Sequence, residues 1–264
     1  LKPINLLEQV SKVPQRIFLS ATIPSKNQFI ASVGLTTYPL IIRYVDLKTA
    51  DDSKLTTGNR LIVPLPNSIN LDQDDPKKEY QQRIARNVAY IASQFEKVVV
   101  LARSNSEISG LVDFLNKDSS FKKEIYSSNV SNFHLTYQKF TESKDAILLL
   151  ANRYSGLDFS GDTCSVAIIT SVPSRCNEVE KFHEDELKDK KYNDEKTAIR
   201  LVQSFGRCNR SSNDTGVYFV LDGRFYSSFN NQLDYSKYYP SNITNEIFEG
   251  TKLTDDLYQK GQTA

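Results

Sequence analysis

The chain has 264 residues, of which 39% are hydrophobic and 25% are charged, which is typical of a globular protein with one large or two small domains. Its formal net charge of +1 excludes a strongly basic domain, so any nucleic-acid groove has to be local. The longest apolar runs are far shorter than the roughly 20 residues that cross a bilayer, and we predict no membrane contact.

Short apolar runs alternate with helical patterns along the chain. Most of the runs are apolar on both faces, as in a parallel sheet covered by helices. In chain order, the predicted strands are Arg16–Ser20, Leu40–Val45, Arg60–Pro64, Lys97–Ala102, Ala146–Ala151, Ser165–Ser171 and Gly216–Leu221.

Three stretches between these strands repeat apolar residues at helical spacing. The stripes are Tyr80, Ile84, Val88 and Ile91, then Ile108, Leu111, Val112 and Leu115, then Ala198, Leu201, Val202 and Phe205. This alternation predicts an α/β fold whose mostly parallel central sheet is flanked by helices on both faces.

Several segments carry no such pattern. Residues 46–59 are polar and predict a linker or a surface loop, and the densely charged residues 181–195 predict a solvated helix or an insertion. We expect the chain to fray after Gly250.

The three cysteines, Cys164, Cys176 and Cys208, form no CxxC pair, and His134 and His183 are far apart, so we predict no metal site. Unpaired cysteines and the lack of a secretory leader favour a cytoplasmic protein. The sequence contains no methionine, even at its first position, and we expect it to be a piece of a longer protein.

The segment from Gln203 to Arg210 follows the third helical stripe. If the helix continues at about 100° per residue, Gln203, Arg207 and Arg210 share the face opposite the apolar stripe. Arginine suits phosphate because its charged, planar fork binds two oxygens. Gly206 within a helix costs roughly 1 kcal/mol, which indicates a close ligand or backbone. The alternative is an ordinary amphipathic helix with solvated arginines.

The polar segment Asn152–Gly161 follows a predicted strand, at the strand end where α/β sheets bind ligands. Gly156 permits backbone conformations that other residues resist. Asp158 can accept a hydrogen bond from a ribose hydroxyl. The alternative is an ordinary connection in which Asp158 caps a turn. Near the start of the chain, Ser20 and Thr22 follow another strand and can relay hydrogen bonds between domains, or simply begin a helix.

Together, and in this order, these segments resemble the motifs of superfamily 2 helicases. Ser20-Ala-Thr22 resembles motif III, the strand that ends in Ala102-Arg103-Ser104 resembles motif IV, and Asn152–Asp158 resembles motif V. Gln203–Arg210 matches motif VI, Q-x-x-G-R-x-x-R, at every fixed position.

Details within residues 16 to 226 favour the DinG/XPD branch of this superfamily. The run that begins at Gly156, with Val172-Pro173 after the next strand, has the shape of that branch's motif V. Residues 216–225 resemble its segment after motif VI. Ser155 departs from the branch, which often has glutamate there.

The resemblance implies a RecA-like fold with three parts: residues 1–45 as the end of a first RecA-like domain, 46–250 as the second motor domain, and 251–264 as a tail. ATP and Mg²⁺ bind between two such domains, and the first brings the phosphate loop, which has no match here. The resemblance therefore implies that this chain alone does not hydrolyse ATP. An iron–sulfur cluster, where present, belongs to the first domain.

By the same resemblance, Arg207 and Arg210 would be arginine fingers, worth roughly 10³–10⁵ in rate, with Gln203 coupling the cleft to the domain interface. Asp158 would contact the ribose, and Gly156 and Gly206 would shape the ATP-binding loops.

The remaining motifs would serve coupling and nucleic-acid binding. Ser20 and Thr22 would couple hydrolysis to domain closure, and Arg103 and Ser104 would face a nucleic-acid backbone. Closure and opening would then move the motor along single-stranded DNA, or RNA, with little sequence preference.

Three functions fit these motifs. The first is an ATP-dependent DNA helicase or translocase. The second is a nucleic-acid-stimulated ATPase of a restriction or anti-phage complex that does not unwind its substrate. The third is a RecA-like interaction module without catalysis, against which the intact Gln203, Arg207 and Arg210 count.

Overall fold

The computed structural model divides the chain into two units, Leu1–Leu55 and Thr56–Ala264. The residues that the structure describes all belong to the second unit. They are 58–65, 76–127, 132–154, 157, 159, 163–174, 177–209, 213–230 and 236–262. The strands predicted at Arg16–Ser20 and Leu40–Val45, and the whole of motif III, lie outside these residues.

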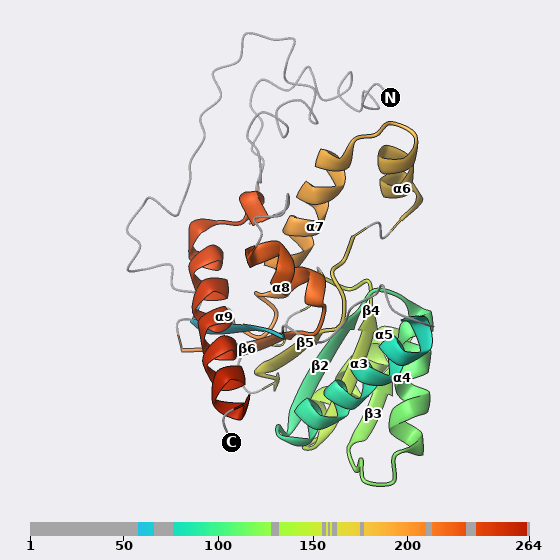
Figure 1. Ribbon diagram of the computed structural model, residues 1–264. Helices are drawn as coiled ribbons and strands as arrows, with labels where there is room; N and C mark the ends of the chain where they lie inside the picture. The colour runs from blue at the N-terminus through green and yellow to red at the C-terminus, as the bar shows by residue number, and fades with distance from the viewer. Residues whose placement is uncertain are drawn as a thin grey trace, which may run out of the picture. The chain divides into compact units, whose positions relative to one another are not determined.

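Six parallel strands form one sheet in the described part of the chain (Figure 1). They are β1 (Asn59–Pro64), β2 (Lys97–Ala102), β3 (Glu124–Ser127), β4 (Ala146–Ala151), β5 (Val166–Ile169) and β6 (Thr215–Val220). Their order across the sheet is β1-β6-β5-β2-β4-β3, so β2 and β5 lie at the centre.

The helices cover both faces of this sheet. They are α3 (Pro76–Ser93), α4 (Asn105–Lys117), α5 (Phe133–Glu142), α6 (Glu178–Asp185), α7 (Lys190–Ser204), α8 (Gly223–Asn230) and α9 (Ser241–Gln262), with a short 3₁₀ turn, η5 (Ser236–Tyr238). The predicted α/β RecA-like fold, with a parallel sheet between helices, is confirmed.

Alternate residues of each strand divide the core into two layers, as the pleat requires. Val98, Val100, Ile147 and Leu149 pack against α3 and α4, and we call this the α3/α4 face. Val99, Leu101, Leu148 and Leu150 point the other way, toward residues of α5, α7 and α9, and we call this the α7/α9 face. The candidate site lies on the α7/α9 face.

The five strands predicted within the described residues are all present, and β5 is shorter than the predicted run. The sequence did not predict β3. This strand has only four residues, EIYS, and it pairs on one side only, at the edge of the sheet. Because its ends are exposed and its middle is half-buried, it carries no strong apolar signal.

The densely charged segment forms a helical hairpin, α6 and the start of α7, that projects beyond the sheet (Figure 1). A buried ion pair holds the hairpin, because Glu180, only 2% exposed, accepts hydrogen bonds from Arg200. Arg200 Nη1 also donates to Pro173 O at 3.0 Å. His183 stacks on Tyr192 with 3.9 Å between the ring centroids.

The expected fraying after Gly250 is wrong for residues 251–262, because α9 continues through them. Thr251 and Thr254 are buried, and their hydroxyls donate to Ile247 O and Gly250 O at 2.8 and 2.9 Å. Gly250 itself lies against the main chain of Ile62 in β1. None of the described helices is long and apolar enough to cross a membrane.

Candidate nucleotide half-site

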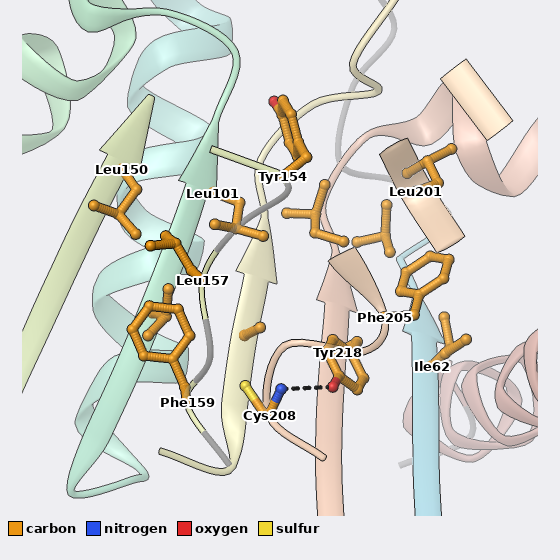
Figure 2. Packing of buried hydrophobic residues seen from close by; sticks show 14 of the residues in the cluster. Ile62, Leu101, Leu150, Tyr154, Leu157, Phe159, Leu201, Phe205, Cys208 and Tyr218 are labelled. Atoms are coloured by element: carbon orange, nitrogen blue, oxygen red, sulfur yellow. Dashed lines mark hydrogen bonds between the residues drawn. The ribbon is translucent and has the colours of Figure 1, made fainter. Parts of the chain in front are cut away.

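The connection from β4 to β5, which carries motif V, crosses the α7/α9 face. Its residues Tyr154, Leu157 and Phe159 are buried in the core of this face (Figure 2). Phe159 packs edge-on against Phe140 of α5, with 6.2 Å between the ring centroids. Apolar anchors therefore fix the motif V connection on the sheet. The predicted ligand residues Gly156 and Asp158, between these anchors, lie outside the described residues.

The turn that carries motif VI begins where α7 ends, at Ser204. The amide of Phe205 still reaches Leu201 O, but Gly206 N and Arg207 N donate to Gln203 O and Ser204 O, as in a tightening last turn. The continuous helix expected through Arg210 is therefore wrong.

Gly206 lies in this turn, after the end of the helix. The loss of stability that a glycine causes inside a helix therefore does not apply to it. Among the described residues, a Cβ added there would touch Gln203 O at 3.8 Å, an ordinary van der Waals distance. No backbone in the described part of the chain comes close enough to require the glycine, and its role at a nucleotide stays a prediction.

Arg207 points into the protein and is 6% exposed. Its Nε donates to Gln203 O at 2.9 Å, and its Nη1 donates to Leu157 O of the motif V connection. Its own carbonyl accepts from Phe159 N at 2.8 Å. The expectation that Arg207 and Gln203 share the helix face opposite the apolar stripe is therefore wrong, because the helix ends before Arg207. Motifs V and VI instead bind each other directly, through the guanidinium and the main-chain carbonyl of Arg207.

A tyrosine of β6 holds the next two residues of the turn. The hydroxyl of Tyr218 accepts a hydrogen bond from Cys208 N at 3.0 Å and donates to Asn209 Oδ1 (Figure 2 shows the first of these bonds). Burial raises the pKa of Tyr218 well above its usual value, so the hydroxyl keeps its proton. Tyr218 was not among the residues that the sequence indicated, since a tyrosine in a buried strand predicts only packing.

Two cysteines join the same region. The thiols of Cys164, just before β5, and Cys208 are hydrogen-bonded to each other, and both residues are buried. The bond from Cys164, together with burial, raises the pKa of Cys208, which stays a thiol. Cys176 lies outside the described residues.

Arg60 of β1 supports the end of α7 from the other side. Its Nη1 donates to Phe205 O at 3.4 Å, and its Nη2 forms an ion pair with Glu246 of α9 at 2.9 Å. The side chain of Arg60 is 8% exposed, so little water competes for these bonds. The sequence did not single out Arg60 either.

The motif IV residues lie at the carboxyl end of β2. Ser104 is the N-cap of α4, and its Oγ accepts from Glu107 N at 3.2 Å, while Arg103 N donates to Glu107 Oε2 at 3.1 Å. The side chain of Arg103 is exposed. Burial raises the pKa of Glu107.

The start of the motif V segment lies beside motif IV. Asn152 N donates to Ala102 O at 2.9 Å, and the guanidinium of Arg153 lies 4.2 Å from the centre of the Phe133 ring. The structure therefore brings Arg103 and Ser104 next to residues 152–153.

A hollow of about 600 Å³ lies at the other end of the sheet, where β3 and β4 begin. Lysine and acidic side chains line it, among them Lys122, Glu124, Lys139 and Asp145. It shares no residue with the motifs. Within the described residues, no group of three or more histidine, cysteine or acidic side chains is placed to hold a metal ion.

Two further groups of predicted site residues cannot be placed. Ser20 and Thr22, predicted to couple the domains, and Arg210, the second predicted arginine finger, lie outside the described residues. The structure thus brings together Gln203, Gly206 and Arg207 with the motif V connection, and we call this group the half-site.

The comparison with solved structures gives one match that shares the fold and a weaker one. The structure described as "XPD_Helicase" matches with a TM-score of 0.57 and 17% identity over 86% of this chain, and this chain spans 43% of that protein. "Structure of S. tokodaii Xpd4" matches with a TM-score of 0.47 and 13% identity, over 68% of this chain and 38% of that one. Among curated proteins, none matches the sequence.

A family model decides the assignment. The model described as "Helicase C-terminal domain" matches residues 87–242, which is more than half of the chain and includes motifs IV, V and VI. As the resemblance to the DinG/XPD branch predicted, the chain belongs to the helicase C-terminal domain family.

Proposed function

We propose that this chain is the C-terminal motor half of an ATP-dependent DNA helicase or translocase. Its ATP site would be completed by an N-terminal RecA-like domain of the same protein. The observation that carries the proposal is the direct bonding of motif V to motif VI, in which Arg207 Nη1 donates to Leu157 O and Phe159 N donates to Arg207 O. Two loops tied in this way can present nucleotide contacts in a fixed arrangement.

The two arginines of motif VI would do different work. The guanidinium of Arg207 donates to two main-chain carbonyls, those of Gln203 and Leu157. Arg207 would therefore fix the shape of the nucleotide site and transmit conformational changes between motifs V and VI. Arg210, three residues further, would be the arginine finger that reaches the γ-phosphate from the turn. Gln203, partly buried beside this turn, would couple the cleft to the domain interface.

The remaining contacts of the nucleotide would come from the motif V connection. Gly156 and Gly206 would give the loops room, and Asp158 would bind the ribose. ATP would fit the side chains proposed for it, because the amide of Gln203, the guanidinium of Arg210 and the carboxylate of Asp158 can bind phosphate and ribose oxygens. Mg²⁺ would be held by acidic residues of the N-terminal domain, where an iron–sulfur cluster would also lie if the protein has one.

Nucleic acid would cross the carboxyl end of β2 and β4. Arg103 is exposed there and would bind a phosphate of single-stranded DNA, or of RNA. The hydroxyl oxygen of Ser104 already accepts a hydrogen bond from the amide of Glu107. Ser104 would therefore donate its hydroxyl proton to a phosphate oxygen of the nucleic acid. Ser20 and Thr22 would couple closure of the two domains to hydrolysis.

The test is ATP hydrolysis by the full-length protein that carries this chain, with and without single-stranded DNA. We expect DNA to stimulate turnover and Arg210→Ala to lower kcat by roughly 10³-fold or more, because an arginine finger acts on the transition state. Arg86→Ala is the matched control, since Arg86 is an exposed arginine of α3, across the sheet. It should leave kcat unchanged.

Other outcomes separate the alternatives. A protein that binds no ATP, or that keeps its turnover as Arg210→Ala, is not this motor, and the interaction module becomes the better description. A protein that hydrolyses ATP with DNA but displaces no strand from a duplex is a nucleic-acid-stimulated ATPase without unwinding.

A further inference from the structure

One hydroxyl group from a neighbouring strand binds two residues of the motif VI turn. Tyr218 of β6 is fully buried, and its hydroxyl accepts from Cys208 N at 3.0 Å while it donates to Asn209 Oδ1. These two residues stand between Arg207 and the predicted finger, Arg210. A single hydroxyl thus fixes a main-chain amide and a side chain in the stretch that leads to Arg210.

The surroundings leave this hydroxyl little freedom. The ring of Tyr218 packs edge-on against Phe205, the residue that directly follows α7, with 5.8 Å between the ring centroids. Gly216, two residues earlier in β6, keeps the space open. A Cβ at Gly216 would lie 2.9 Å from the Tyr218 hydroxyl and 3.0 Å from Asn209 Oδ1.

The hydrogen bonds have a fixed direction. Burial raises the pKa of Tyr218, so the phenol stays protonated and donates to the side-chain amide oxygen, Oδ1, of Asn209. The phenol oxygen is then left to accept the Cys208 amide. Asn209 is 1% exposed, so water does not replace the tyrosine.

We propose that Tyr218 is a positioning residue of the ATP site, which holds Cys208 and Asn209 and so sets where Arg210 is presented. This inference rests on the function proposed above. A displacement of about 1 Å in a group that acts on the transition state costs about 100-fold in rate. Loss of the hydroxyl should therefore lower kcat about 10- to 100-fold. The KM for ATP should change little, because the displaced group, the Arg210 finger, would act mainly on the transition state.

The experiment replaces the hydroxyl and keeps the ring, as Tyr218→Phe in the full-length protein. The quantities to measure are kcat and KM of DNA-stimulated ATP hydrolysis, with the affinity for a fluorescent ATP analogue. Tyr126→Phe is the matched control. Tyr126 lies in β3 of the same sheet, and its hydroxyl also makes two hydrogen bonds, to Glu124 at 2.5 Å and Ser143 at 2.9 Å. We expect this control to keep the wild-type kcat.

A second variant separates positioning from stability. Tyr218→Phe combined with Asn209→Leu replaces both partners of one bond by apolar groups, a change that can be nearly neutral for stability. If Tyr218 positions the turn, the double variant regains melting temperature but keeps the low kcat. If kcat recovers together with the melting temperature, Tyr218 is only structural and the inference is overturned.

Arg210→Ala in the same assay keeps the two proposals apart. A wild-type protein without ATP hydrolysis overturns the proposed function, and this inference with it. If the wild type hydrolyses ATP and Arg210→Ala does not, while Tyr218→Phe matches Tyr126→Phe in kcat, only the role of Tyr218 is overturned.

Discussion

The two faces of the sheet are covered in different ways. Among the described side chains of α3 and α4, the fully buried ones are all apolar, whereas the carboxylate of Glu107 at the start of α4 is half-buried. The α7/α9 face also buries polar groups near its centre, among them Arg207, Asn209 and the hydroxyl of Tyr218, each with a hydrogen-bond partner. Apolar packing tolerates small shifts, whereas a buried hydrogen bond fixes a distance and a direction. One face therefore mainly stabilises the domain, and the other also defines a geometry.

The largest expected effect is on stability, and it comes from adding a methyl group at Gly250, where α9 packs against β1. The Cβ of Gly250→Ala would collide with the carbonyl of Ile62, where both groups belong to main chains that cannot turn aside. We expect a loss of about 3 kcal/mol or more in the free energy of unfolding, measured by urea denaturation.

Gly110→Ala is the matched control, because Gly110 is also a helix glycine but no atom of the described residues lies within 4 Å of an added Cβ. It should gain about 0.5–1 kcal/mol from helix propensity. Equal effects at the two glycines would mean that α9 does not pack on β1 as described.

The next largest effect on stability comes from removing the buried guanidinium of Arg207. Arg207→Met keeps an extended side chain but removes the donors to Leu157 O and Gln203 O. We expect a loss of about 2–3 kcal/mol in unfolding free energy, because buried carbonyls lose charged partners.

Leu111→Met on the α3/α4 face is the counterpart, and it should cost less than about 1.5 kcal/mol, since it conserves volume in an apolar layer. If the two substitutions lower the free energy of unfolding equally, the contrast between the two faces of the sheet is wrong.

Proteolysis should also cut the motif V connection faster in Arg207→Met than in the wild type, because that connection loses its hydrogen bond from Arg207 to Leu157 O.

The sequence predicted the layered fold well, because that fold depends on local periodicity. Apolar runs and helical stripes identified β1, β2, β4, β5 and β6 and the helices α3, α4 and α7, whereas α9 was not predicted. The motif VI letters identified the region of the half-site. Strand β3 was missed, since a short and partly exposed edge strand has no distinct pattern.

The geometry of the half-site was harder to predict, because it depends on contacts between distant residues. The helical pattern gave no sign that α7 ends at Ser204, and the direction of Arg207 follows from that end. The partners of Arg207 and Tyr218 lie 50 and nine to ten residues away in sequence. A buried arginine and a strand tyrosine carry no signal of such partners in a single sequence.

The smallest expected effect concerns Glu107, an acidic group at the start of α4. Burial raises its pKa above the ordinary value of 4.5, although the amide of Arg103 and the hydroxyl of Thr170 oppose the shift. Between pH 4.5 and the raised value, the folded protein binds more protons than the unfolded chain. Stability therefore falls as pH rises through this window, and it stays at the lower level above it.

Glu107→Gln should remove this loss, because an amide does not ionise and its oxygen can still accept from Arg103 N. We expect the unfolding free energy of the variant, relative to the wild type, to rise from pH 4 to pH 7. A Glu107→Gln curve parallel to the wild type would mean that Glu107 is solvated, and that the start of α4 is more open than the layer beneath it.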